Sequence, residues 1–499
     1  MKITLIISIL TTMLFASDSE LLKRIEALEN EIKTLKNIAN INRKHTEENT
    51  EEIDDNFSIL EKIERKSILD KLNLSPELEL RADFFDYKVG DIDGENTLIH
   101  DAGGKYDQQT RRTNYSKSFE PAASIKFRIN MDAEIDNQLS FHGNLLFSTS
   151  SQSNERVCIL SRDIKSQTSN SAFDVERAYF NYTPNKHSEN AFTLSAGLLP
   201  TTGGTPMQFG QSSKRKSMFP ALVFDMNTYG LIATQKLADD TFIRAIIAKA
   251  YTLDGTFYPY QCNRENIDNA NVIGLYTDTK FDFLGKSLLS FGINILHDFK
   301  AHPYLGPDVG SNDSKVLGDI FTFGLGIDIE KFLDKDITLF IHSALSNPHG
   351  NGEVDDYQIA LNPNDPTQTL SDGLTAAGIT GFSEAPYAKG TMLKKDGYSI
   401  YLGAKYDINQ AFNIGAEYNY GSKYWFSATQ GAQDMYNKLA TRGHVGEIYA
   451  IWRLHKNLHT KIGYMYSKEN YTGSGWHFGE PVKKDGKQKV GYISLKAKF

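Results

Sequence analysis

The sequence predicts an all-β transmembrane barrel of about 16 antiparallel strands, preceded by a long N-terminal coiled-coil helix. Three observations support this fold class. Beyond residue 76, apolar and polar residues alternate in many short segments, and the links between these segments alternate between short and long. Residues 19–72 follow a heptad pattern instead. Beyond the N-terminus, no apolar run approaches the roughly 18 residues that a membrane helix needs.

The composition narrows the class of protein further. Hydrophobic residues make up 40% of the chain, charged residues 23% and aromatic residues 11%, which suits strands that are apolar on one face. The formal net charge is −8 and both signs are interspersed, so the chain shows no electrostatic footprint for nucleic acid. A large soluble β-protein could share this composition, and only the order of strands and links separates the two classes.

Residues 1–16 are typical of a secretory signal peptide. Met1 and Lys2 precede an apolar run that ends at Phe15, and we expect cleavage after Ala16. Export would place the rest of the chain where a disulfide is chemically permitted. Cys158 and Cys262 therefore either form a disulfide or remain as two thiols.

Residues 19–72 are predicted to form a periplasmic coiled coil. The stretch 19–71 contains neither Gly nor Pro, and its apolar residues recur at heptad positions a and d. At about 1.5 Å per residue, such a helix would reach roughly 75 to 80 Å. Asn42, Asn49 and Asn56 also fall at position d, which indicates a partly hydrated seam.

Two short patterns in this stretch resemble trimer signatures. Arg24, Ile25, Leu28 and Glu29 match an Arg-apolar-x-x-apolar-Glu trimerisation motif. The sequence from Asn49 to Ile53 resembles the asparagine-at-d repeats of trimeric surface-fibre stalks. On one heptad frame the two patterns favour three chains over two, and a single solvated helix is the alternative.

The barrel begins after the coiled coil and covers residues 76–499. In residues 124–132 every odd position is apolar and every even position is polar or charged, so one face would meet lipid and the other water. Counting such segments, we predict strands near residues 78–87, 122–134, 139–149, 173–182, 191–199, 228–236, 241–251, 271–281, 287–297, 319–329, 336–345, 397–407, 411–420, 445–454, 458–467 and 489–499.

The links between these strands alternate in length. Short links such as 135–138 and 455–458 alternate with long ones such as 88–121 and 200–227. Short turns at one rim and long loops at the other are typical of outer-membrane barrels. The last strand ends at Phe499 and resembles the C-terminal signal that the barrel assembly machinery reads.

The sequence contains no catalytic, cofactor-binding or metal-ligating constellation. It lacks the G-x-S-x-G and Cys-x-x-Cys patterns, and His142 and His342 stand isolated on predicted strands. The remaining chemistry is that of a pore lining, which either selects solutes or only solvates the lumen. The predicted lining residues are Arg81, Lys126, Arg128, Asp132, Arg177, Arg244, Asp328, Lys405, Glu417, Arg453 and Lys461.

Residues 174–180 and 195–201, DVERAYF and SAGLLPT, carry a family likeness. With the order of signal peptide, coiled coil, barrel and terminal Phe, they resemble a porin-like outer-membrane family of unknown function, found mainly in epsilon-class proteobacteria. This resemblance implies a barrel surrounded by outer-membrane lipid and lipopolysaccharide. In general porins of sixteen strands the third long loop folds inward. By that resemblance, Lys214, Arg215 and Lys216 would place positive charge at a constriction.

Two functions compete. The first is a homotrimeric channel for passive diffusion of small hydrophilic solutes or ions, because a barrel of sixteen strands encloses an aqueous lumen. The second is a structural tether or adhesin, whose coiled coil holds the outer membrane near peptidoglycan while the long loops face outward. An outer-membrane hydrolase ranks third, because no nucleophile–base pair emerges, and we expect no cofactor.

Overall fold

The chain divides into two compact units, Met1–Lys71 and Leu72–Phe499. The computed structural model describes residues 23–47, 71–92, 115–150, 171–250, 270–301, 315–350, 361–362, 365–369, 395–429, 434, 436–471 and 483–499. The predicted signal peptide at residues 1–16 lies outside these ranges, as do Cys158 and Cys262.

The first unit contains a helix over residues 23–47. Its side chains are exposed, including Ile25 and Leu28, which fall at heptad positions a and d. The described helix is shorter than the coiled coil predicted over 19–72, and Asn49 and Asn56 lie outside the described residues. Within the described ranges, no helix is both long and apolar enough to cross a membrane.

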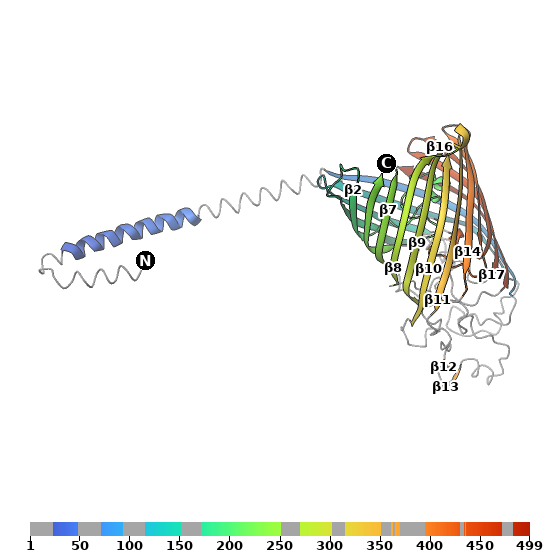
Figure 1. The fold of residues 1–499 in the computed structure, drawn as a ribbon, viewed down its shortest axis with the longest axis horizontal. Coiled ribbons are helices and arrows are strands. Elements are labelled where there is room, and N and C mark those ends of the chain that lie inside the picture. The colour runs from blue at the N-terminus through green and yellow to red at the C-terminus, as the bar shows by residue number, and fades with distance from the viewer. Residues whose placement is uncertain are drawn as a thin grey trace. The chain divides into compact units, whose positions relative to one another are not determined.

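The second unit is a closed barrel of sixteen strands, each paired antiparallel with its neighbours (Figure 1). The strand β1 pairs with β18, with Leu78 opposite Ala497, and this pairing closes the barrel. A separate two-stranded sheet joins β12 (Leu361–Asn362) to β13 (Asp365–Thr369). The barrel strands are β1 (Leu72–Ile92), β2 (Tyr115–Glu134), β3 (Leu139–Ser150), β4 (Ser171–Tyr182), β5 (Phe192–Leu198), β6 (Thr228–Ala238), β7 (Thr241–Ala250), β8 (Asn271–Asp282), β9 (Lys286–Ala301), β10 (Lys315–Glu330), β11 (Ile337–Gly350), β14 (Gly397–Asp407), β15 (Phe412–Gly421), β16 (Gly443–His455), β17 (Leu458–Tyr471) and β18 (Lys483–Lys498).

The predicted strand count of sixteen is confirmed, but several strand ends differ from the predicted ones. Several strands run farther toward the long loops than predicted, as in β11, which continues to Gly350, and β18, which begins at Lys483. A strand that leaves the apolar band has no lipid face, so its sequence stops alternating while its backbone pairing continues. At the opposite rim, β1 begins at Leu72, four residues before the predicted barrel start at 76.

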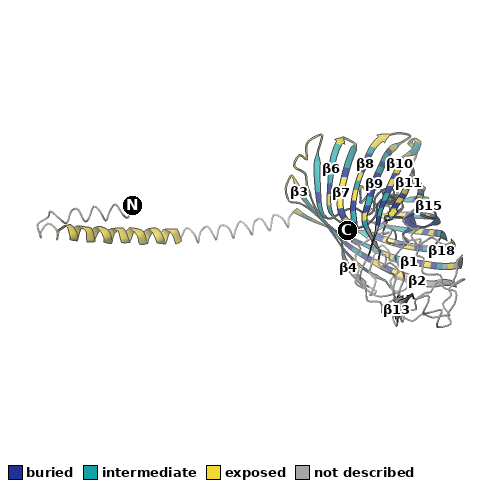
Figure 2. Ribbon diagram, turned by 60° about the horizontal axis from the view of Figure 1, so that its bottom comes forward, coloured by how far each residue is buried: buried dark blue, intermediate teal, exposed yellow. Residues whose placement is uncertain are grey.

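The outer wall is apolar at alternating positions, as exposed and buried residues alternate along the strands in Figure 2. On β16, Ile448 is 60% and Trp452 54% exposed, whereas Glu447, which precedes Ile448, is 8% and Tyr449 4% exposed. Because successive side chains of a strand point to opposite faces, the exposed apolar row forms the surface that lipid would cover.

The inner wall differs from the prediction along β7 to β11. We expected a water-facing surface there, but Ile246, Val272, Leu296, Ile320 and Phe340 belong to one buried apolar cluster inside the barrel. Most of its other members come from two long-loop segments: residues 199–226, and Trp425, Phe426, Ala428, Leu439 and Ala440. The inner face of these strands is apolar because the folded loops pack on it.

Candidate functional site: the barrel lumen

The segment between β5 and β6, residues 199–227, lies inside the barrel and contacts the inner wall on several sides. The guanidinium of Arg177 donates to the carbonyl oxygens of Thr202 at 2.6 Å and Lys216 at 2.9 Å. Farther around the wall, Arg215 pairs with Asp278 of β8 at 2.7 Å, and the Thr205 hydroxyl donates to Asp328 of β10. The inward fold of this loop, expected by resemblance, is therefore present.

A β-bulge in β4 explains how the wall holds this loop. The register shifts between Asn144 and Leu145, so Glu176 is the extra residue of the β4 strand. Glu176 and Arg177 consequently both contact groups inside the barrel. Glu176 accepts two hydrogen bonds from Arg128, at 2.9 and 3.0 Å, while Arg177 holds the loop backbone. Both belong to the segment 174–180 that carries the family likeness.

A short helix within this loop, α4 (Met207–Gln211), stands between two cavities. Met207 and Gly210 line a cavity of about 90 Å³, whereas Gln208 and Phe209 line a cavity of about 930 Å³. A Cβ added at Gly210 would lie 2.5 Å from Glu417 Oε1, so the Glu417 carboxylate would have to shift. The helix α4 is therefore a partition in the lumen.

The larger cavity reaches the rim of short turns and is rich in positive charge. Asp240 lies in the turn after β6, and Asp282 and Lys286 are the strand ends on either side of the turn between β8 and β9. Seven basic side chains face four acidic ones along its lining. The basic ones are Lys214, Arg215, Lys280, Lys286, Lys405, Arg453 and Lys498, and the acidic ones are Asp240, Asp282, Asp328 and Glu330.

The smaller cavity is lined by paired charges and tyrosine rings. Arg81 binds both carboxylate oxygens of Asp83, and its guanidinium carbon lies 4.2 Å from the Tyr492 ring centroid. Lys461 pairs with Glu447 at 3.1 Å, and Lys496 reaches Glu77 at 2.5 Å. Opposed cations and carboxylates of this kind produce a transverse field in a narrow lumen.

The described residues of a second loop, 422–442 between β15 and β16, also lie inside the barrel, and the sequence did not indicate this. Lys438 of this loop donates to Glu417 and, at 2.6 Å, to Glu447. The Tyr436 hydroxyl donates to Asp83 at 2.9 Å. The adjacent apolar pair Trp425 and Phe426 was the available signal of burial, but a loop shows no periodicity that places its side chains.

Most predicted lining residues face the lumen. Arg81, Lys126, Arg128, Glu417 and Lys461 line the smaller cavity, whereas Asp328, Lys405, Arg453, Lys214 and Arg215 line the larger one. Arg244 pairs with Asp278, and Arg177 contacts loop backbone rather than a cavity.

The two histidines that the sequence shows as isolated each have an acidic partner in the structure. Asp132 bonds His142 at 2.6 Å, and Asp328 bonds His342 at 2.8 Å.

Lys216 lies in a different environment from Lys214 and Arg215, its two basic neighbours in the sequence. Burial lowers the pKa of its ammonium well below the usual range, and the nearby cations Arg128 and Lys496 lower it further. Glu77 and Glu176 oppose this shift. The three basic residues 214–216 thus occupy different environments and do not form one charged patch.

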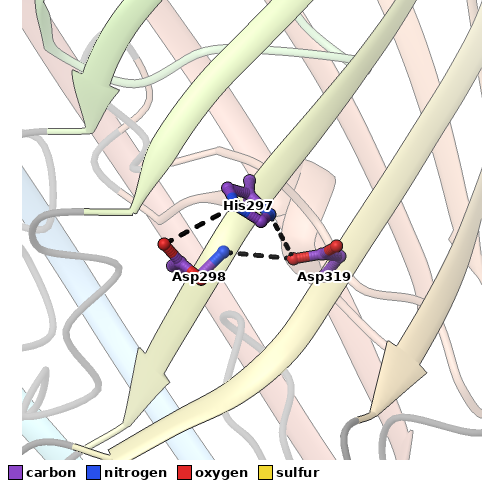
Figure 3. Close-up of side chains that lie close together, drawn as sticks. All are labelled: His297, Asp298 and Asp319. Atoms are coloured by element: carbon purple, nitrogen blue, oxygen red, sulfur yellow. Dashed lines mark hydrogen bonds and ion pairs between the residues drawn. The ribbon is translucent and has the colours of Figure 1, made fainter.

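Within the described ranges, one group of side chains has the spacing of metal ligands. His297, Asp298 and Asp319 each place a ligand atom within 4.8 Å of the others (Figure 3). A register shift beside Gly318 sets Asp319 of β10 opposite both His297 and Asp298 of β9. His297 Nδ1 lies 2.8 Å from Asp319 Oδ1, and the backbone N–H of Asp298 donates to the same oxygen at 3.1 Å. No local sequence pattern marks this group, because the register shift in the β9–β10 pairing brings its residues together.

The fold and the lumen together define a class: a closed antiparallel barrel, apolar outside, with short turns at one rim and inward-folded loops, is a porin-type β-barrel. The chain belongs to the family described as "Protein of unknown function (DUF3373)", whose family model matches residues 117–496. This match confirms the resemblance to a family of unknown function. No curated protein sequence matches the chain.

Several solved structures are similar in fold. The outer membrane channel DcaP of Acinetobacter baumannii is 11% identical, with a TM-score of 0.42, over 86% of this chain and 97% of that one. OmpF of Salmonella typhi, in complex with daunomycin, is 12% identical, with a TM-score of 0.41, over 86% and 97%. OprB of Pseudomonas putida is 9% identical, with a TM-score of 0.43, over 87% and 96%. Identities this low assign no solute and no residue role to this chain.

Proposed function

We propose that the protein is a porin-like outer-membrane channel for passive diffusion of small hydrophilic solutes, with a preference for anions. The observation that carries the proposal is the larger cavity, about 930 Å³, in which basic side chains outnumber acidic ones seven to four. A confined excess of one charge raises the local concentration of the opposite ion. The partition at α4 narrows the route, so this excess lies next to the constriction.

The test is single-channel conductance of the refolded protein in a planar bilayer, with salt gradients to measure the reversal potential. We expect discrete steps and an anion-selective potential. Replacing Lys214, Arg215 and Lys216 together with Gln should lower the anion-to-cation permeability ratio about threefold, because the larger cavity loses the positive charges of Lys214 and Arg215 beside α4. Lys186→Gln is the matched control, since Lys186 is 48% exposed in a short turn and lines neither cavity.

Each outcome has a distinct meaning. A folded barrel without conductance would contradict the channel and leave a structural role. A conducting triple variant with an unchanged permeability ratio would contradict the selectivity assigned to this loop while leaving the channel in place.

We also propose that the mature chain begins after Ala16 and assembles as a homotrimer through residues 19–72 in the periplasm. The support is the helix over 23–47, where the a and d positions Ile25, Leu28, Ile32 and Leu35 are 41%, 40%, 52% and 59% exposed. At the C-terminus, Phe499 is 72% exposed and its backbone N–H bonds Pro76 O at 2.9 Å, which suits a role in recognition by the assembly machinery.

The same helix supports the alternative function, a tether near peptidoglycan. Deleting residues 18–70 separates the two, because β1 begins at Leu72 and the barrel forms a unit of its own. A channel keeps its unit conductance after this deletion while chemical cross-linking into trimers disappears. If the protein is a tether, cells with the deletion lose envelope integrity, measured as leakage of periplasmic enzyme. In that case neither the full chain nor the deletion variant conducts.

A further inference from the structure

The described residues of the loop 422–442, which are 422–429, 434 and 436–442, form a folded element. Trp425 and Phe426 are 1% and 4% exposed, and the Trp425 indole N–H donates to Leu439 O at 2.8 Å. Arg442 Nε donates to Trp425 O at 3.0 Å. These two hydrogen bonds connect the incoming and outgoing arms of the loop.

The two inward loops meet each other. Asp225 and Thr429 form a parallel β-bridge, and the Asp225 N–H donates to Ala428 O at 3.0 Å. The loop 199–227 therefore supports the loop 422–442 from within the barrel. Both loops line the smaller cavity, with Met207 and Gly210 from the first and Tyr436 and Lys438 from the second.

The outgoing arm of the second loop places one cation beside two carboxylates of the barrel wall. Asp434 accepts hydrogen bonds from the backbone N–H groups of Tyr436 at 3.2 Å and Lys438 at 2.7 Å, which orients this turn. The Lys438 ammonium then bonds Glu417 of β15 and Glu447 of β16. All three charged side chains are more than nine-tenths buried from bulk solvent, yet all three line the cavity.

The two carboxylates depend on Lys438 to different degrees. Glu447 also pairs with Lys461 at 3.1 Å and accepts a hydrogen bond from Tyr492. For Glu417, Lys438 is the one cation that the described residues place within ion-pair distance. Burial alone would lower the pKa of Lys438, but Glu417 and Glu447 raise it well above its usual range, so the ammonium stays charged.

We propose that Lys438 is the charge-selectivity residue of the lumen: by neutralising Glu417 at the narrower cavity, it permits the passage of anions. The inference rests on the proposed channel function and assigns its selectivity to a second loop. Without the ammonium, the Glu417 carboxylate would keep the hydrogen bond from the Tyr401 hydroxyl at 2.6 Å but would lose its compensating charge, and a net negative charge would face the ion path. Lys438 itself need not touch a solute, because its effect is on the charge of the wall.

The test compares three variants with the unaltered protein by reversal potential in a salt gradient. Lys438→Met should shift the permeability ratio toward cations about tenfold, the order expected for one unit charge roughly 10 Å from the ion path at an effective dielectric constant near 20. Lys438→Arg keeps the charge and should leave the ratio unchanged. The double variant Glu417→Gln with Lys438→Met removes both charges and should restore most of the anion preference.

The double variant separates electrostatics from structure. A loop that merely loses its packing would stay altered in the double variant, so failure of the restoration overturns the inference. An unchanged ratio in Lys438→Met overturns it as well, provided that heat-modifiable mobility on gels shows a folded barrel. If the unaltered protein does not conduct, the proposed channel function fails. If it conducts but the variants do not behave as expected, only the inference about Lys438 fails.

Discussion

A chain in which Met207–Gln211 is replaced by Gly-Ser-Gly should conduct roughly two to four times the current per channel of the unaltered protein, because the narrowest segment limits flow through a pore. The helix α4 separates the two cavities, and its removal would join them. The anchors formed by Thr205 with Asp328 and by Arg177 with Thr202 lie outside the replaced residues. The barrel should therefore keep its fold, and the measurement is single-channel conductance at symmetrical salt.

The matched control replaces a segment of similar length at the surface. Residues 186–189 lie in an exposed short turn and line neither cavity, so a Gly-Ser replacement there should leave the conductance unchanged. Equal conductance in the control and in the α4 variant would show that ions pass by a route that avoids α4, and the partition would be wrong.

Ile448→Arg should destabilise the folded barrel by about 2 to 4 kcal/mol, the range for an arginine facing lipid near the bilayer midplane. Ile448 is 60% exposed and lies on the outer face of β16. On that face Trp452 lies toward the short turn, and His444, which bonds Tyr418 at 2.7 Å, lies toward the long loops. Aromatic residues mark the two interfaces of a membrane barrel, which places Ile448 between them.

The measurement is the urea dependence of folding into lipid vesicles, followed by heat-modifiable mobility. Ile448→Val keeps the side chain apolar and is the control, with an expected loss below about 1 kcal/mol. If the Arg and Val variants unfold at the same urea concentration, Ile448 does not face lipid, and the inward and outward assignment of β16 would have to be reversed.

The strand pattern was predictable because its cause is local. Alternation over residues 124–132 reports one lipid face and one lumen face of β2, and both follow from side-chain directions that reverse at each residue. The charged residues predicted from that alternation, such as Lys126 and Arg453, do line the lumen cavities. The same local signal misplaced the strand ends toward the long loops, where no lipid face constrains the sequence.

The site itself was predictable only in part. Resemblance indicated an inward loop with Lys214, Arg215 and Lys216, but their separate environments depend on Asp278 and Glu77, far away in the chain. The bulge at Glu176, which turns two neighbouring charges inward, has no mark in the sequence pattern. A period of two predicts that Arg177 faces the lumen and Glu176 faces lipid, and the bulge reverses that for Glu176.

The sequence by itself determined the number of strands, the parity of their links and most of the lumen-facing charges, since each follows from a repeat of two residues or a turn of a few. Only the tertiary structure decided what fills the lumen. Thr205 with Asp328 and Tyr436 with Asp83 are 123 and 353 residues apart. Contacts of that separation form when the closed barrel brings loops and strands together, and they leave no local periodicity in the chain. For the same physical reason, Lys438 was indistinguishable from any other loop lysine until Glu417 and Glu447 were placed around it.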